Sequence, residues 1–172
     1  MNTDERWVGW LAGMIDGEGT VAIARSLNRK GYQRGIQMRA FVQIAGTERA
    51  AIDRAKELLE QVSGHRAFIH AVTRYNPNHK PGWAVGTYSN SAMLALLTIL
   101  RPLFIIKKEH AVGVGAFWRR HLIPGRRRTD EDFHFDEIDY ARCRVLNARG
   151  NHGGPDLADL EAMLHESEPH DG

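Results

Sequence analysis

The sequence predicts one α+β domain whose elements follow the order α-β-β-α-β-β-α. Two periodicities carry this prediction. Apolar residues recur three and four positions apart in the segments assigned to helices, and apolar and polar residues alternate in the segments assigned to strands. Polar links between the paired strands are typical of hairpins. The 172 residues are enough to bury a core, and the single Cys143 excludes an internal disulfide and suits a reducing cytosol.

The N-terminal segment predicts a helix that ends in a glycine-flanked acidic residue. Small residues at positions 12 and 13 let a second backbone approach closely, and the helix stops in Gly17-Glu18-Gly19. A strand follows over about residues 20–27. A carboxylate held where two backbones meet is well placed to bind a metal ion. The apolar face of this helix contains Trp7, Leu11, Met14 and Ile15.

The first hairpin joins the strand over residues 20–27 to a second strand over about 36–45 through a polar link at 28–35. Alternation in the second strand separates a Gln- and Arg-bearing face from an apolar one. Arg pairs well with guanine and Gln with adenine in the major groove, which admits a two-stranded ribbon. A solvated sheet face is the competing interpretation. The polar face contains Gln37, Arg39, Phe41 and Gln43, and the apolar face contains Met38, Ala40, Val42 and Ile44.

A helix is expected to open at Thr47 as its N-cap and to end at residues 63–64, where Gly64 follows the last apolar position. A second hairpin is expected from Arg66–Tyr75 and Trp83–Tyr88. Period-two spacing places three basic side chains of this hairpin on one face, where they would read or clamp DNA: Arg66, His70 and Arg74.

Two helices are expected next, around residues 91–100 and 104–120. Beyond them, residues 136–148 and 157–164 look helical. The basic run at 126–128 either contacts phosphates or is a solvated linker. The predicted division is therefore a core over residues 1–122 and a small, helical, acidic extension over residues 123–172 that packs on it.

Charge is divided unevenly along the chain. Residues 1–128 contain 20 Lys and Arg against 9 Asp and Glu, whereas residues 129–172 contain 3 against 12. A basic body beside an acidic tail suggests a surface that binds a polyanion and an outer layer kept away from it. A signal peptide is not expected, because the N-terminus is polar up to Arg6. A membrane-spanning segment is not expected either, because Arg101-Pro102 interrupts the longest apolar run.

The nonamer Leu11–Gly19, Leu-Ala-Gly-Met-Ile-Asp-Gly-Glu-Gly, resembles the signature of the LAGLIDADG homing endonucleases and differs from it at Met14, Gly17 and Glu18. The competing interpretation is an amphipathic helix that ends in a solvated glutamate. The motif occurs once, and single-motif members of this family act as homodimers. The resemblance implies the family's fold, with a saddle-shaped antiparallel DNA-binding sheet, and two motif helices packed about a dimer axis.

The resemblance also implies roles for individual residues. Glu18 is the expected catalytic metal ligand, and the backbone carbonyl of Gly17 is a further ligand. Residues 100–102 match the Leu-x-Pro turn that precedes a basic residue near the active centre, which makes Lys107 the catalytic cation, unless it only pairs with Glu109 or solvent. Lys108 is the next candidate for this role.

Two further points follow from the same comparison. Asp16 is a weaker candidate ligand because it lies within the helix and would cap or pair instead. The family often places a Gln just after its second strand to organise water, but residues 45–47 are Ala-Gly-Thr. Gln43 is interpreted as a base-reading residue and not as a replacement for that Gln.

The full set of expected contacts combines the strand faces, the hairpin links and the motif helix. Residues expected to bind DNA are Ser26, Asn28, Arg29, Lys30, Tyr32, Arg34, Gln37, Arg39, Gln43, Arg66, His70 and Arg74. Residues expected at the dimer interface are Trp7, Leu11, Ala12, Gly13, Ile15 and Asp16.

By resemblance, the expected function is that of a homodimeric, site-specific DNA endonuclease encoded by a mobile element such as an intron. It would hydrolyse both strands of a long, nearly palindromic site with Mg²⁺ and leave short 3′ overhangs. Mn²⁺ or Ca²⁺ would also occupy the site, and Ca²⁺ would bind without supporting cleavage. The alternatives are a non-cleaving maturase or regulator, and a sheet that contacts protein. The expected location is the cytoplasm, or the organelle or nucleoid that holds the host DNA, with no membrane contact.

Overall fold

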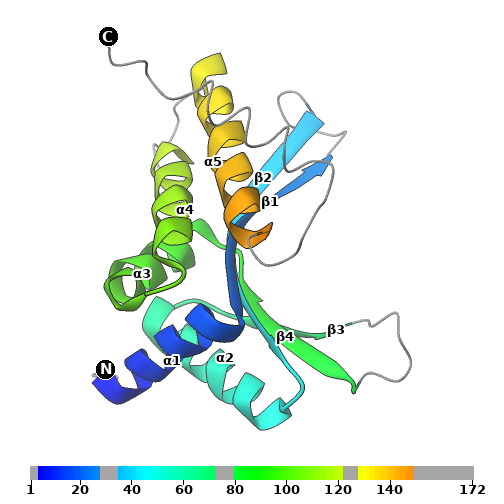
Figure 1. Ribbon diagram of the computed structural model, residues 1–172, viewed down its shortest axis with the longest axis vertical. Helices are drawn as coiled ribbons and strands as arrows, with labels where there is room; N and C mark the ends of the chain where they lie inside the picture. The colour runs from blue at the N-terminus through cyan, green and yellow to red at the C-terminus, as the bar shows by residue number, and fades with distance from the viewer. Residues whose placement is uncertain (1–3, 28–34, 73–79, 122–127, 149–172) are drawn as a thin grey trace.

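The computed structural model describes residues 4–27, 35–72, 80–121 and 128–148 and confirms the α+β class. Within these residues, helices lie beside one antiparallel sheet (Figure 1). The element order agrees with the expected α-β-β-α-β-β-α succession. The elements are α1 (Glu5–Glu18), β1 (Gly19–Leu27), β2 (Ile36–Gly46), α2 (Arg49–Ser63), β3 (Phe68–Val72), β4 (Gly82–Thr87), α3 (Asn90–Leu100), the 3-10 helix η2 (Arg101–Leu103), α4 (Lys108–His121) and α5 (Asp130–Ala148).

The four strands form one sheet in the order β1-β2-β4-β3, with every neighbouring pair antiparallel. The β1–β2 pair and the β3–β4 pair extend in different directions from the centre of the sheet (Figure 1). Strand alternation then sorts the side chains as the sequence predicts. Ala40, Val42 and Ile44 of β2 are buried in the core, while Arg39 on the other face is exposed.

The helix expected from Thr47 begins at Arg49 instead, with Glu48 at the N-cap and no side-chain hydrogen bond to the cap. Its C-terminus agrees with the prediction, since Gly64 adopts a φ of 68° and closes the helix.

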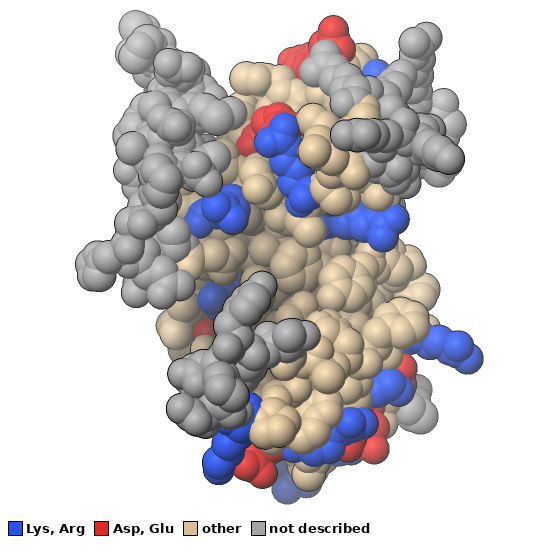
Figure 2. All heavy atoms as spheres, turned by 90° about the vertical axis from the view of Figure 1, so that its right-hand side faces the viewer, with Lys and Arg blue, Asp and Glu red and all other residues tan. Residues whose placement is uncertain are grey.

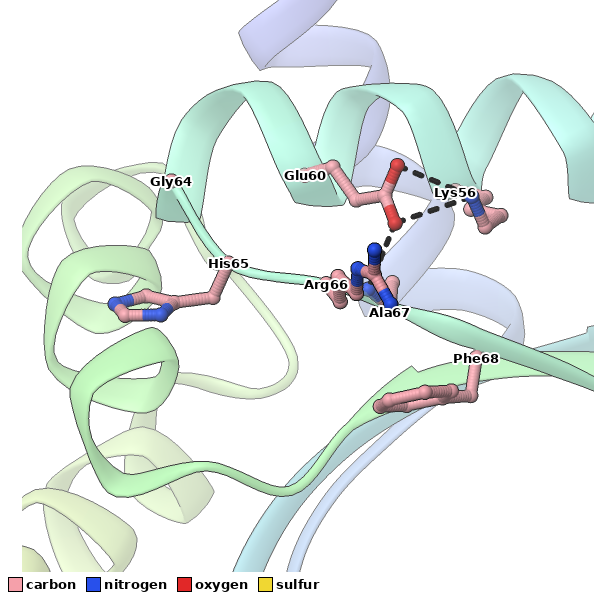
Figure 3. Close-up of a pocket in the computed structure, with 7 residues that line it drawn as sticks. All are labelled: Lys56, Glu60, Gly64, His65, Arg66, Ala67 and Phe68. Atoms are coloured by element: carbon pink, nitrogen blue, oxygen red, sulfur yellow. Dashed lines mark hydrogen bonds and ion pairs between the residues drawn. The ribbon is translucent and has the colours of Figure 1, made fainter.

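The strand expected from Arg66 begins at Phe68, because α2 holds the connecting residues in another path. The Ala67 N–H donates to Glu60 Oε1 at 3.0 Å, and Lys56 Nζ donates to the same carboxylate at 3.1 Å (Figure 3). Arg66 is therefore part of the α2–β3 link and lies beside Glu60, off the strand that contains His70.

The helix expected from Phe104 begins at Lys108. Phe104 has extended dihedral angles (φ −74°, ψ 136°), which a helical residue does not adopt. The backbone N–H groups of residues 105–107, just before α4, donate to the carboxylate of Asp16 in α1. Residues 101–103 form η2, and the backbone then becomes extended at Phe104.

The helix expected from residue 136 begins at Asp130, because the sequence Thr-Asp-Glu-Asp at 129–132 forms a reciprocal cap. The Thr129 N–H donates to Asp132 Oδ2 at 2.8 Å, and the Asp132 N–H donates to Thr129 Oγ1 at 3.2 Å. This signal was visible in the sequence and was missed. The resulting helix, α5, packs on α4 and β1.

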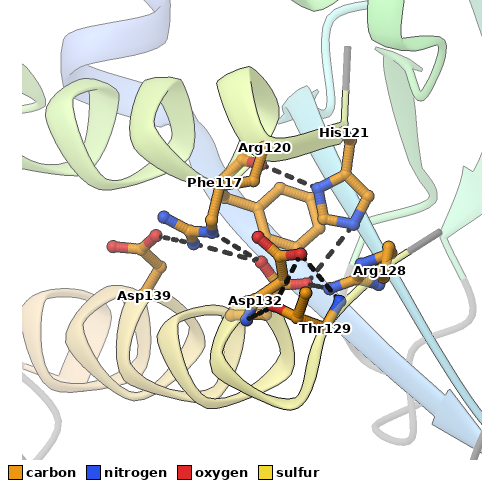
Figure 4. Close-up of polar contacts among 8 residues, drawn as sticks. Phe117, Arg120, His121, Arg128, Thr129, Asp132 and Asp139 are labelled. Carbon is orange, nitrogen blue, oxygen red and sulfur yellow. Dashed lines mark hydrogen bonds and ion pairs between the residues drawn. The ribbon is translucent and has the colours of Figure 1, made fainter. Parts of the chain in front are cut away.

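A buried ionic cluster joins α5 to α4 (Figure 4). Asp136, whose side chain is 2% exposed, accepts from Arg120 at 3.1 Å and lies 3.3 Å from His121 Nε2; Arg128 also pairs with it. Asp139 pairs with Arg120, and burial raises the pKa of the Asp139 carboxyl against the opposing effect of that guanidinium. The described part of the acidic extension therefore neutralises basic groups of the core. The division at residue 122 stays a prediction, and the expected contacts of residues 126–127 and the helix at 157–164 lie outside the described residues.

None of the helices in the described ranges is long and apolar enough to cross a membrane.

Candidate functional site

The candidate site begins at the end of α1, where Glu18 is the last helical residue and its side chain is exposed. The next residue must be glycine, because a Cβ on Gly19 would lie 2.6 Å from both Cα and O of Ile15. The last turn of α1 contains no basic residue. The final carbonyls of a helix lack intrahelical partners and form its negative end, so the carboxylate and these carbonyls together favour a cation.

Asp16 is used within the chain. Its carboxylate accepts the N–H groups of Ile105 at 2.7 Å, Ile106 at 3.2 Å and Lys107 at 2.8 Å. The expectation that Asp16 pairs or caps is confirmed, and its placement in a dimer interface stays a prediction. The three bonds fasten the loop before α4 to the motif helix.

The same bonds bring Lys107 to the Glu18 end of α1, since Asp16 lies two residues before Glu18. Lys107 is partly buried, and its carbonyl accepts the Ala111 N–H at 2.9 Å, which anchors the start of α4. Lys108 is the first residue of α4 and is exposed. Lys107 is therefore the lysine whose backbone is bound to the motif helix.

The donor atoms at this helix end are all oxygen, which suits Mg²⁺ and Ca²⁺. Among the described residues, no group of three or more His, Cys, Asp and Glu side chains is placed to hold a metal ion. In the last turn of α1, the Asp16 carboxylate is bonded to backbone amides, and Glu18 is the exposed carboxylate. Glu18 and the Gly17 carbonyl fit a divalent cation only as part of a larger ligand set that includes atoms from outside this chain.

One face of the sheet lies opposite the core and gathers most of the predicted DNA contacts that the structure describes. The register pairs Ser26 with Gln37 and Thr20 with Gln43, so these four side chains share that face. His70 joins them through the pairs of β3 with β4 and of β4 with β2, and it is exposed. We call this surface the open face; it contains Ser26, Gln37, Arg39, Phe41, Gln43, Phe68 and His70, with Tyr88 beside Phe41.

Sequence reasoning missed two aromatic residues at this surface, Phe68 and Tyr88, which are 59% and 37% exposed. Each lies at the end of a strand, where alternation is least informative. Arg66 is exposed but lies in the α2–β3 link, outside the strand face to which it was assigned. The remaining predicted contacts lie outside the described residues: Asn28, Arg29, Lys30, Tyr32, Arg34 and Arg74.

The exposed side of α1 differs from the predicted dimer interface. Leu11, Ala12 and Ile15 are buried within the chain's own core, so their side chains are not accessible to a second copy. The prediction took the apolar stripe as the outer face, but this stripe packs on the sheet and neighbouring helices. Trp7 remains 41% exposed and lies under Arg54, whose guanidinium carbon is 4.1 Å from the ring centroid.

Three glycines, Gly9, Gly13 and Gly17, form the exposed side of α1 at four-residue spacing, and we call them the glycine ridge. A Cβ added at any of them would meet nothing within 4 Å in this chain. Gly13 is thus the predicted interface residue that combines small size with open space.

Charged side chains are distributed unevenly on the side of the molecule that faces right in Figure 1. Figure 2 shows uncharged side chains in the middle of this side, with Lys and Arg and some Asp and Glu above them, and both signs mixed below. At the far end of β1, Arg25 points to the core side and pairs with Glu137 of α5 at 3.4 Å. The acidic helix therefore binds basic groups on the covered side of the sheet.

Comparison with solved structures finds the same fold in several homing endonucleases. No protein-family model matches the chain, and no curated protein sequence matches it. The homing endonuclease I-CvuI in complex with its target is 15% identical with a TM-score of 0.66, over 92% of this chain and 92% of that one. The archaeal intron-encoded homing endonuclease I-Vdi141I complexed with DNA is 16% identical with a TM-score of 0.65, over 95% of this chain and 98% of that one.

A third similar structure, the LAGLIDADG meganuclease I-CpaMI bound to uncleaved DNA, is 15% identical with a TM-score of 0.58; the match covers 95% of this chain and 52% of that one. The shared architecture spans nearly the whole chain despite the low identity. The protein therefore has the fold of the LAGLIDADG homing endonucleases, with its signature-like nonamer at the end of α1.

Proposed function

We propose that this protein is a homodimeric, site-specific DNA endonuclease that depends on a divalent metal ion. The observation that carries the proposal is the junction of α1 and β1. There Glu18 lies at a cation-favouring helix end, Asp16 ties Lys107 to the same helix, and the Gln- and Arg-bearing open face begins within two residues. The DNA complexes of I-CvuI and I-Vdi141I support it.

The homodimer completes the site. The glycine ridge allows two copies of α1 to approach closely about a two-fold axis, and such an interface is isologous, so each copy uses the same surface. This arrangement brings the two Glu18 carboxylates near each other. Like charges held close together repel, and divalent cations relieve that repulsion.

Glu18 and the backbone carbonyl of Gly17 hold the metal in this proposal, and phosphate oxygens of the DNA complete the ligand set. Mg²⁺ is the expected ion for such oxygen ligands, with Mn²⁺ and Ca²⁺ as substitutes; I-CvuI complexes were determined in the presence of Ca and of Mg. When bound, the metal supplies activation of water and stabilisation of the leaving 3′ oxygen.

The remaining roles belong to residues of the chain. Lys107 places a positive charge beside the phosphate that is cut. The open face orients the duplex by contacts with base edges, and the two copies of this face read the two halves of a nearly palindromic site. The products are double-strand breaks with short 3′ overhangs. The protein works where its host DNA lies, in the cytoplasm, an organelle or the nucleoid, and serves a mobile element such as an intron.

The test is cleavage of a randomised duplex library containing palindromic sites, followed by sequencing of the ends. We expect cuts at one motif in Mg²⁺, specific binding without cuts in Ca²⁺, and no cuts in EDTA. Glu18→Gln should lower the cleavage rate at least about 100-fold while leaving specific binding in place. Glu5→Gln makes the same change at the other end of α1 and should cleave normally. Specific binding without cuts in Mg²⁺ or Mn²⁺ contradicts the nuclease and indicates a maturase or regulator.

A further inference from the structure

A side-chain hydrogen bond on the open face orients the amide of Gln43. The hydroxyl of Tyr88 donates to Oε1 of Gln43 at 3.2 Å, across 45 residues of sequence. Because the amide oxygen points toward Tyr88, the NH₂ group points to the other side, where its two N–H bonds can donate. No described residue accepts from that nitrogen in a recorded hydrogen bond.

Tyr88 is itself held in place from two sides. Its ring stacks on Phe41, with centroids 5.7 Å apart and planes at 27°. Its backbone is fixed between Thr87, which pairs with Val42, and Ser89, whose Oγ accepts the Ala92 N–H at 3.1 Å as the cap of α3. The hydroxyl position therefore follows from the sheet and from α3, and it does not depend on Gln43.

On the β4 side, no side chain stands directly opposite Gln43. Its cross-strand partner is Gly86, where a Cβ would lie 2.6 Å from the Val42 carbonyl oxygen and 3.3 Å from Cβ of Gln43. Phe68, the next residue in the same row, is 59% exposed. A base edge therefore approaches Gln43 over a gap that no side chain of β4 occupies.

We propose that Tyr88 is a positioning residue that sets the base preference of Gln43. This inference rests on the proposed DNA recognition. A free glutamine reads adenine with both ends of its amide, accepting from N6 and donating to N7. Gln43 has its oxygen engaged and faces the base with donors. It therefore prefers the keto bases, guanine through O6 and N7 or thymine through O4, over adenine and cytosine, whose amino groups would oppose its own NH₂.

The experiment is selection of bound duplexes from a randomised library in Ca²⁺, followed by sequencing, with the full-length protein and four variants. Gln43→Ala identifies the symmetric pair of positions that Gln43 reads. Tyr88→Phe removes only the hydroxyl and keeps the ring on Phe41, and the double variant tests whether both act at the same positions. Tyr140→Phe makes the same change on α5, away from the open face, and serves as the control.

We expect the unaltered protein to select guanine or thymine at these positions and Gln43→Ala to lose that preference. Tyr88→Phe should admit adenine there, with a change of about fivefold in the ratio of adenine to keto bases. The double variant should match Gln43→Ala, and Tyr140→Phe should match the unaltered protein. Equal melting temperatures for the unaltered protein and Tyr88→Phe exclude a general loss of structure.

Adenine at these positions in the unaltered protein, or an unchanged preference in Tyr88→Phe, overturns the inference. Absence of any enriched duplex overturns both the inference and the proposed DNA recognition. Incubating the enriched duplex with Mg²⁺ separates nuclease activity from the role of Tyr88. A duplex that is bound but not cut contradicts the nuclease, while the base preferences of the variants still test the role of Tyr88.

Discussion

At the scale of single residues, Asp16 and Glu18 show how two acidic side chains of one motif take different roles. The Asp16 carboxylate accepts hydrogen bonds from three backbone amides and has a structural role. Glu18, at the end of the helix, is exposed. One glycine between Asp16 and Glu18 is enough to give them different surroundings, because residues two positions apart on a helix point in different directions.

Replacing Asp16 with Ala should lower the free energy of unfolding by about 2 kcal/mol, because three N–H groups lose a charged acceptor. Cleavage should fall as well, since the loop that positions Lys107 is released from α1. Urea unfolding and a cleavage assay measure the two effects. Asp53→Ala in α2, where the carboxylate bonds to the exposed Arg49, should change stability by less than about 1 kcal/mol; an equal loss in both variants contradicts the role assigned to Asp16.

Gly19→Ala tests the close approach at the end of α1. The added methyl group would meet the Ile15 backbone at 2.6 Å, so we expect a loss of about 1–3 kcal/mol in unfolding free energy. Gly115→Ala in α4 is the matched change in open space and should stabilise the helix by about 0.5–1 kcal/mol. Thermal and urea denaturation of the two variants should thus give opposite signs.

At the scale of elements, side chains from one element determine where another begins. Glu60 of α2 binds the Ala67 N–H before β3, Asp16 of α1 binds the Lys107 N–H before α4, and Asp136 fastens α5 to α4. These contacts join residues that are 7 to 91 positions apart. A local sequence pattern therefore cannot predict the long-range contacts among them.

Stability should depend on pH through Glu60. The Ala67 N–H bond, opposed by desolvation and aided by Lys56 and Arg66, holds the pKa of this carboxyl below its ordinary value of 4.5. A lowered pKa means that the ionised form favours the folded state, so the contribution is complete above pH 4.5 and disappears as the pH falls through the folded-state pKa. Unfolding free energies measured from pH 7 downward should show Glu60→Gln less stable at neutral pH, with the difference shrinking in acid. A constant difference contradicts this origin.

The ionic cluster should be the main attachment of α5. Asp136→Ala leaves Arg120 and Arg128 without their shared buried partner, and we expect a loss of about 3 kcal/mol. Glu131→Ala, an exposed residue in the first turn of the same helix, should cost much less. Hydrogen exchange of α5 amides locates the effect: faster exchange confined to α5 agrees with detachment of this helix, and unchanged exchange contradicts it.

At the scale of the whole molecule, the proposed homodimer makes a single chain half of a site. A two-fold axis would duplicate Glu18, the glycine ridge and the open face. The chain shares its fold with I-CvuI at only 15% sequence identity. A fold can persist at such low identity, because it depends on buried packing and strand register, while surface residues are free to change.

Gly13→Arg should convert the proposed dimer into a folded monomer. The substitution places a long charged side chain on the glycine ridge, and helix propensity favours Arg over Gly, so the chain itself should remain folded. Light scattering should report 19.4 kDa instead of twice that mass, and cleavage should be lost. Val112→Arg, on the exposed side of α4, should remain dimeric; a monomeric unaltered protein contradicts the homodimer.

The sequence by itself determined the element order, both hairpins, the inward face of β2 and the acidic helix end, because all of these depend on period and turn residues within about fifteen positions. It assigned Leu11 and Ile15 to a second copy, since periodicity identifies an apolar stripe without naming what covers it. Only the tertiary structure decided that the chain covers this stripe itself, that Asp16 holds the loop of Lys107, and that Tyr88 orients Gln43. These outcomes depend on groups distant in sequence that meet only after the sheet and helices have packed.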